Sequence, residues 1–140
     1  MCKRWSAYPY TMTHPDTTTL TEEEFKYELK GLAELCLAKT GVKMAPFYRP
    51  PEGRYNEKTL RLASEFGYKT VFWSFAYADW DNDKQPEAQA AMKKILDNMH
   101  NGAILLLHPT SATNADILPE LIQTLRGDGY RLASLSDLCV

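Results

Sequence analysis

The sequence predicts an α/β fold in which helices alternate with parallel strands. Apolar residues recur at helical spacing after capping residues, short β-rich or apolar runs separate these stretches, and the two kinds of segment alternate along the 140 residues. Strict alternation is typical of βα units with right-handed crossovers. At this length we expect one domain, residues 1–140, that buries about two thirds of its unfolded surface.

The first helix is expected from Thr21 to the residue before Gly41. Thr21 can cap it, and Glu24 three residues later completes a capping box. The residues that would face the core are Phe25, Leu29, Leu32 and Cys36. Gly41 favours the helix end, and a short strand over residues 46–48 is expected to follow.

The second and third helices lie on either side of a β-rich run. Asn56 caps the second helix and Gly67 ends it. Residues 68–75 are then expected to form a strand, because β-branched and aromatic residues dominate them. Pro86 opens the third helix, whose predicted core residues are Ala88, Met92, Ile95, Leu96 and Met99.

Two further strands and one helix complete the pattern. Residues 103–107 form a continuous apolar run, which predicts a strand covered on both faces. Thr113 or Asn114 starts the last helix, which extends through Leu125. A final strand is expected over residues 130–132.

Composition and charge exclude several function classes. The net charge of −2, with both signs well mixed, argues against a nucleic-acid partner, which would need a basic stripe. The longest apolar run is far short of the ~20 residues of a membrane span. Cys2, Cys36 and Cys139 lack metal-like spacing and are expected to be buried apolar residues or free thiols.

Three polar residues stand where predicted strands end: Arg49, Asp79 and His108. Loops at the ends of parallel strands gather at one edge of the sheet, so these side chains can converge on a hydrolytic site. A histidine is able to act as a general acid at neutral pH. A buried aspartate beside it would fix the orientation of the ring.

Each of these residues also has a plain structural explanation when it is taken alone. Arg49 could form a surface salt bridge, Asp79 could be a turn residue, and His108 could be a hydrogen-bonded capping residue. A fourth candidate, His14, lies on a loop before the first helix, where a metal ligand could stand. A lone histidine is nonetheless most often an ordinary loop residue.

The same stretches carry a family resemblance. They are Thr-His-Pro-Asp at 13–16, Tyr-Arg-Pro-Pro-Glu-Gly at 48–53, Thr-Val-Phe-Trp-Ser-Phe-Ala-Tyr-Ala-Asp-Trp at 70–80 and Gly-Ala-Ile-Leu-Leu-Leu-His at 102–108. With these motifs the chain resembles the polysaccharide deacetylases of the NodB homology type. It is most similar to the delta-lactam-forming N-acetylmuramic acid deacetylases of peptidoglycan, over nearly everything after about residue 10.

The resemblance implies a partial (β/α) barrel and a hydrolase that removes acetyl groups from an amino sugar. It also implies a divalent metal, most often zinc, and a peptidoglycan-like glycan as substrate. The metal would polarise the acetamide carbonyl and activate a water molecule. The family usually acts outside the membrane, but no export signal follows the first residues of this chain, so the compartment stays open.

The resemblance further assigns roles by position. His14 matches a metal-binding histidine, Arg49 matches the arginine that pairs with the catalytic base, and His108 matches the catalytic acid. Asp79 matches the aspartate that tunes this acid. The residues expected to bind substrate are Leu106, Trp80, Pro50 and Tyr77.

Two departures from the family pattern bear on activity. The family's pair of adjacent aspartates, one of them the base, belongs upstream of His14, and the chain begins after that point. Tyr10, four residues before His14, stands where the family's first metal-binding histidine is expected, and tyrosine, with an unperturbed pKa of about 10, is a poor zinc ligand. We therefore expect an N-terminally truncated chain with the first strands missing and impaired de-N-acetylation. Residues 1–9 also do not resemble the family's helix-strand approach to the histidine motif.

Two alternatives to the enzyme follow from these departures. The chain could be an inactive remnant that binds glycan through Trp80, Tyr77 and the groove near Arg49. It could also be a half-barrel that needs a partner chain to supply the aspartates. Loss of the first strands would leave an open sheet edge and exposed apolar helix faces, so we expect self-association, with a homodimer covering that edge.

Overall fold

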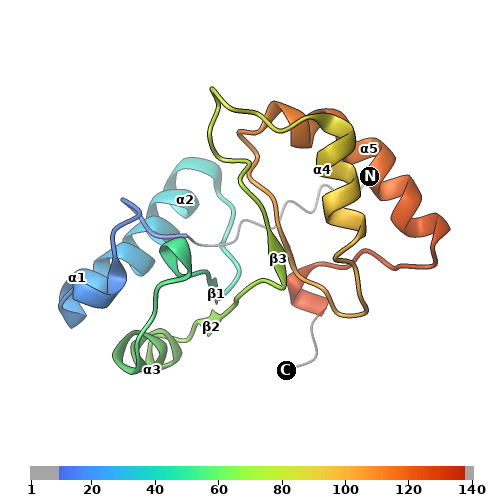
Figure 1. The fold of residues 1–140 in the computed structure, drawn as a ribbon. Helices are drawn as coiled ribbons and strands as arrows, with labels where there is room; N and C mark the ends of the chain where they lie inside the picture. Colours follow the sequence, from blue (N-terminus) through green and yellow to red (C-terminus); the bar gives the residue numbers. More distant parts are fainter. Residues whose placement is uncertain (1–9, 138–140) are drawn as a thin grey trace. The chain divides into compact units, whose positions relative to one another are not determined.

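The computed structural model describes residues 10–137, which form helices and short parallel strands (Figure 1). The predictions for residues 1–9, which include Cys2, and for Cys139 concern residues outside this range. The chain divides into two compact units, Met1–Phe72 and Trp73–Val140. Within the described range, every helix is too short or too polar to cross a membrane.

The helical part of the first unit follows the predicted pattern closely. Helix α1 (Glu22–Lys26) continues through a π-helical segment (Tyr27–Gly31) into α2 (Leu32–Thr40). The capping box is present, because the Thr21 hydroxyl accepts from the Glu24 backbone and the Glu24 carboxylate accepts from the Thr21 backbone. Gly41 ends the helix with a φ of 69°, a left-handed conformation that glycine adopts without strain.

The strands of the first unit are short and parallel. Strand β1 (Phe47–Tyr48) pairs with β2 (Lys69–Thr70), with Phe47 opposite Lys69. Between them lies helix α3 (Glu57–Glu65), which Asn56 caps as predicted. Two short 3-10 turns, Thr17–Thr19 and Pro51–Gly53, flank these elements. The core of this unit is formed by Phe25, Leu29, Tyr48, Leu62 and Ala63.

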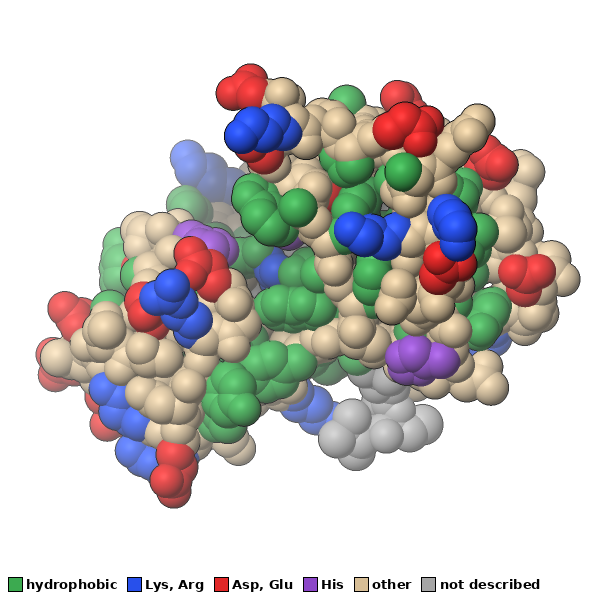
Figure 2. Space-filling model, viewed as in Figure 1, with side chains coloured by type: hydrophobic (Ala, Val, Ile, Leu, Met, Phe, Trp, Pro, Cys, Tyr) green, Lys and Arg blue, Asp and Glu red, His purple; other side chains and the backbone are tan. Residues whose placement is uncertain are grey.

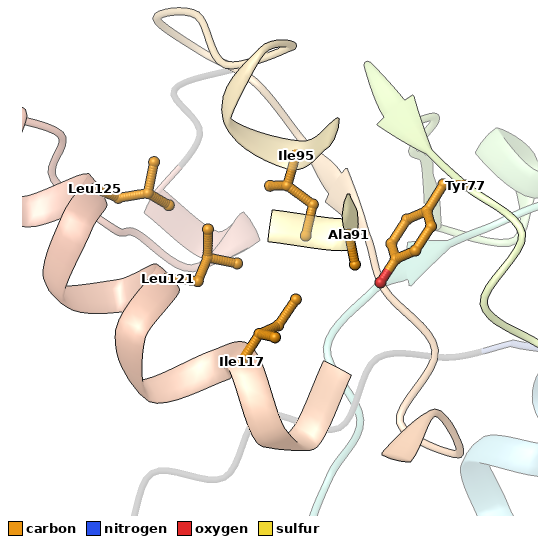
Figure 3. Packing of buried hydrophobic residues seen from close by; sticks show 6 residues of the cluster. All are labelled: Tyr77, Ala91, Ile95, Ile117, Leu121 and Leu125. Atoms are coloured by element: carbon orange, nitrogen blue, oxygen red, sulfur yellow. The ribbon is translucent and has the colours of Figure 1, made fainter. Parts of the chain in front are cut away.

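The second unit repeats the same plan. Strand β3 (Phe75–Ala76) pairs in parallel with β4 (Leu105–Leu106), and helix α4 (Ala88–Leu96) connects them. Helix α5 (Ala112–Gly127) follows β4, and a 3-10 turn (Leu135–Asp137) comes last. Aliphatic side chains of α4 and α5 face the ring of Tyr77 in the core (Figure 3).

Three details of the predicted strands are wrong. Residues 68–75 form two strands rather than one, because Val71 donates its backbone N–H to Tyr48 whereas Ser74 donates to Ile104. The run 103–107 is half-buried rather than covered on both faces: Leu105 and Leu107 pack on the helical core, whereas the alternation of a strand directs Leu106 to the other side.

The third detail concerns the end of the chain. Residues 130–132 form no strand, because the turn at Gly129, with a φ of 87°, directs Tyr130 back onto helix α5. There the Tyr130 backbone donates to the Leu125 carbonyl, and its ring packs against the helical core. The α/β class itself is confirmed, since helices alternate with parallel strands in both units.

The visible surface of the described residues carries mixed charge. Acidic and basic side chains are interspersed on the face that Figure 2 shows. This agrees with the net charge of −2 calculated from the sequence. Cys36 is a free, half-buried thiol on α2.

Candidate active site

The centre of the candidate site is a contact between Asp79 and His108. The two residues follow β3 and β4, which are adjacent and parallel, so both lie at the carboxyl ends of the pair. Asp79 is fully buried, and its Oδ1 lies 2.7 Å from Nδ1 of His108. Its Oδ2 accepts the backbone N–H of His108 at 2.8 Å. An ionised carboxylate only accepts, so we assign a proton to Nδ1 of the ring.

Asn114 adds a third donor to the same carboxylate. It lies in the first turn of α5, where the capping hydroxyl of Ser111 accepts its backbone N–H. Its Nδ2 donates to Oδ2 of Asp79 at 2.6 Å and also to the carbonyl of His108 at 3.2 Å. The sequence predicted no site role for Asn114. A polar residue one turn into the helix that follows a candidate histidine is the signal that could have found it.

Tyr77 lies behind this network. Its hydroxyl donates to Oδ1 of Asn114, and only 7% of the residue is exposed. Burial, and then the charge of Asp79, raise the pKa of the Tyr77 hydroxyl, so the proton that it donates stays in place at neutral pH. The sequence predicts a substrate-binding role for Tyr77, whereas its ring lies in the core against α4 and α5 (Figure 3).

Two further predicted residues lie in the same unit. Trp80 follows Asp79 and is 62% exposed, with its ring edge-on to the ring of His108 at a centroid separation of 6.2 Å. Leu106 lies on β4, two residues before His108, and is half-buried. The structure thus groups Asp79, His108, Asn114 and Trp80 around the end of one strand pair.

The remaining predicted residues belong to the first unit. The buried Glu28 of the π-helical segment holds the loop before His14, because its carboxylate accepts the backbone N–H and the hydroxyl of Thr13. His14 has a φ of 60°, and its ring stacks on Tyr10 with centroids 5.0 Å apart. The Arg49 guanidinium lies 3.6 Å from the centre of the same Tyr10 ring.

Arg49 stays cationic in this setting. Burial lowers the pKa of its guanidinium to about 10, which is still well above neutral pH. The cation then contacts the face of the Tyr10 ring, a favourable arrangement for a partly desolvated arginine. The next residue, Pro50, is fully buried and restricts the backbone at Arg49. Convergence of this group with Asp79 and His108 on one point stays a prediction.

The described residues do not fit the metal that the resemblance implies. A catalytic zinc site takes three protein ligands from histidine, cysteine or carboxylate side chains. Within residues 10–137, no group of three such side chains could hold a metal ion. His14 is present, but Tyr10 stands at the position expected for the first metal-binding histidine, and its ring contacts Arg49 and His14. We therefore derive no chemical step through a metal.

Comparison with known proteins identifies the family. The family model described as polysaccharide deacetylase matches residues 6–71. The peptidoglycan-N-acetylmuramic acid deacetylase PdaA of Bacillus subtilis is 36% identical over 129 residues, which are 92% of this chain and 49% of that protein. The chain belongs to the polysaccharide deacetylase family. The predicted resemblance to N-acetylmuramic acid deacetylases is thereby confirmed.

Solved structures of polysaccharide deacetylases have the same fold. The structure of Bacillus subtilis PdaA, a family 4 carbohydrate esterase, matches with a TM-score of 0.86 and 37% identity, over 91% of this chain and 55% of that one. BA3943 of Bacillus anthracis, described as a CE4 family pseudoenzyme, matches with a TM-score of 0.84 and 27% identity, over 94% of this chain and 45% of that one. The chain spans about half the length of the curated relatives that it matches.

Proposed function

We propose that this chain carries the leaving-group half of a carbohydrate de-N-acetylase, with His108 as the general acid and Asp79 as its partner. The observation that carries the proposal is the double contact between these two residues, through the ring and through the backbone. The family supports it, because PdaA is a peptidoglycan-N-acetylmuramic acid deacetylase. The proposed substrate is therefore an N-acetylated amino sugar in peptidoglycan or a related glycan.

The acid has a defined task in amide hydrolysis. Water adds to the acetyl carbonyl carbon, and the resulting tetrahedral intermediate must break its bond to nitrogen. That bond breaks readily only when the nitrogen takes up a proton, because an amide anion is a poor leaving group. With Nδ1–H directed at Asp79, the proton on Nε2 is the one that His108 transfers. Acetate and a free amine are released.

Asp79 orients the ring of the acid. An imidazolium ring whose Nδ1–H points at a buried carboxylate keeps its orientation throughout the transfer. Trp80 is exposed beside the ring of His108, so its face is open to stack on a sugar ring. Leu106, on the strand that leads to His108, is proposed to contact the acetyl methyl group. Pro50 was expected to bind substrate, but it is fully buried and is proposed only to restrict the backbone at Arg49.

The attacking half of the reaction needs groups beyond those described. We propose that the base is a carboxylate of the family's aspartate pair and that Arg49, cationic at neutral pH, keeps this carboxylate ionised. We propose that a divalent ion, zinc first, joins His14 only where further ligands are supplied. On this basis, de-N-acetylation by residues 1–140 alone is impaired.

A second function is favoured by one observation, the presence of Tyr10 at an expected ligand position in contact with Arg49 and His14. In this alternative the chain binds glycan without cleaving it, or it works with a partner chain that supplies the aspartates. The similarity to BA3943, described as a pseudoenzyme, is compatible with it.

One experiment separates these functions. The purified chain is incubated with N-acetylated peptidoglycan oligosaccharides, with and without zinc, and both acetate release and glycan binding are measured. Acetate release that His108→Gln abolishes supports the enzyme. Binding without release supports the non-catalytic alternative. Release only after a chain carrying the aspartate motif is added supports complementation. Absence of both binding and release with zinc, without zinc and with the added chain contradicts the proposal.

Self-association is a separate proposal. Exposed apolar side chains on and after helix α2, namely Leu35, Leu37 and Val42, favour a homodimer. Light scattering across a concentration series tests it. A mass that rises toward that of two chains supports the dimer, and a monomer at every concentration contradicts it.

A further inference from the structure

We propose that Asn114 and Tyr77 are positioning residues that hold the carboxylate of Asp79 and, through it, select the protonated nitrogen of His108. This inference rests on the acid role proposed above for His108. It concerns groups that do not touch the substrate and act only through the aspartate. Both residues belong to the second unit, and they are distant from each other in the sequence.

The direction of each hydrogen bond follows from the groups involved. Asp79 is surrounded by donors: the backbone N–H of His108, its Nδ1–H, and Nδ2 of Asn114. The Asn114 amide can be placed in only one sense, because Nδ2 faces two acceptors, Oδ2 of Asp79 and the carbonyl of His108. Reversal of the amide would bring two oxygens together.

Tyr77 holds the other end of the amide. Its hydroxyl donates to Oδ1 of Asn114, the oxygen that points away from Asp79. The orientation of the Asn114 amide is therefore fixed at both ends, because two acceptors face its nitrogen and one donor faces its oxygen. Ser111 adds a third restraint, because its hydroxyl accepts the backbone N–H of Asn114.

Burial makes these contacts hard to replace. Asp79 is fully buried, and Tyr77 and Asn114 each expose only 7% of their surface. In such a place water cannot easily substitute for a lost partner, so each deletion leaves an unsatisfied polar group. The carboxylate would then be free to rotate, and its hold on Nδ1–H of His108 would weaken.

The functional consequence is the choice of tautomer. A neutral histidine carries its proton on one ring nitrogen, and the hydrogen bond at the other nitrogen decides which. A carboxylate held in place keeps the proton on Nδ1 and leaves Nε2 to exchange protons with the substrate. A loosened carboxylate would allow both tautomers of His108. Only the tautomer with its proton on Nδ1 leaves Nε2 free to exchange protons with the substrate.

The test is a measurement of the His108 ring by nitrogen NMR on the 15N-labelled full chain, without any substrate. The three ring signals are assigned with His14→Gln and His100→Gln. We expect a single Nδ1–H tautomer with a slowly exchanging proton in the unmodified chain. In Tyr77→Phe, which keeps the ring, we expect this proton to exchange about tenfold faster. In Asn114→Ala we expect a mixture of both tautomers.

Matched controls separate positioning from general loosening. Tyr130→Phe removes a hydroxyl from a ring that packs against the same core, and Thr113→Ala removes a partly buried hydrogen bond to the Pro86 carbonyl next to Asn114. Both controls should leave the His108 signals unchanged. Unchanged signals in Tyr77→Phe and Asn114→Ala would overturn the inference. If Asn114→Ala fails to fold, Tyr77→Phe decides alone.

The same variants distinguish this inference from the proposed function. Faster exchange of the Nδ1 proton in Tyr77→Phe, or a tautomer mixture in Asn114→Ala, supports the positioning role whether or not the chain releases acetate. Acetate release is measured for the same variants after a chain carrying the aspartate motif is added. If the His108 ring signals change but the rate of acetate release does not, the positioning role stands and the acid role of His108 is contradicted.

Discussion

Asp79 holds His108 at two points: one carboxylate oxygen lies 2.7 Å from the ring nitrogen Nδ1, and the other accepts the backbone N–H at 2.8 Å. A single hydrogen bond would leave the ring free to turn about its bond to the chain. Because both oxygens belong to one rigid carboxylate, the two contacts fix the orientation of the His108 ring relative to the His108 backbone. The Asp79–His108 pair is therefore preorganised before any substrate arrives.

Removal of Asp79 should destabilise the chain. Asp79→Ala leaves the donors of His108 and Asn114 without their buried acceptor, and we expect a loss of about 2–5 kcal/mol in the free energy of unfolding. Urea denaturation followed by circular dichroism measures it. Asp79→Asn, which keeps the volume and one acceptor oxygen, should lose less. A loss below about 1 kcal/mol in Asp79→Ala would contradict the network as described.

Trp80 should matter for glycan binding but not for folding. Its side chain is 62% exposed, so Trp80→Ala should change the free energy of unfolding by less than about 0.5 kcal/mol. Binding of N-acetylated oligosaccharides, measured by calorimetry, should weaken about tenfold through loss of stacking. Tyr27→Ala is the matched control, because Tyr27 has the same exposure. Equal weakening in both variants would argue against a specific role for Trp80.

Acid stability should depend on Asp16. Hydrogen bonds from Thr18 and then from Arg54 lower the pKa of the Asp16 carboxyl to about 2. A carboxyl with a lowered folded-state pKa stabilises the fold above its unfolded pKa of about 3.9, and this contribution is lost as the pH falls toward 2. Asp16→Asn should therefore lower the urea midpoint at pH 6 but not at pH 2.

Thr18→Ala refines the same prediction. It removes the hydroxyl that lowers the pKa of Asp16 most, so the acid transition should move to higher pH. Urea midpoints measured at half-unit pH intervals locate it. A difference between Asp16→Asn and the unmodified chain that is the same at pH 6 and pH 2 would refute the role of Asp16.

Introducing a histidine at position 10 should raise the zinc affinity of the loop that carries His14. Tyr10→His places a second imidazole four residues before His14 and removes the ring that contacts Arg49. We expect zinc affinity to rise about tenfold or more, as measured by competition with a zinc-sensitive dye. His14→Ala in the same background should reverse the gain. Equally tight, His14-dependent binding by the unmodified chain would show that its own residues already form the site.

Local signals made much of the fold predictable. The capping box at Thr21 and Glu24 and the stop at Gly41 need only neighbouring residues, and the structure has both. The division of residues 68–75 into two strands depends on where Tyr48 and Ile104 lie, which no local pattern contains. The missing strand at 130–132 has a similar cause, because Tyr130 packs on α5 instead of pairing.

The candidate site was predictable to a similar degree. Asp79 and His108 stand directly after strands, and the parallel pairing of β3 with β4 brings them together. Asn114 and Tyr77 were not assigned to the network, since their contact joins residues 37 positions apart and depends on the register of α5. Burial of Tyr77 likewise follows from tertiary packing and not from its place in the motif.

The most direct measurement is acetate release by a chimera of Bacillus subtilis PdaA in which residues 73–137 of this chain replace the matching segment. It tests whether this chain supplies a competent acid half, independently of its base and metal. We predict release within about tenfold of the parent enzyme, a decrease of about 10²–10⁴-fold in His108→Gln, and no change in His100→Gln. A folded chimera without activity, or one that His108→Gln leaves unaffected, would contradict the account.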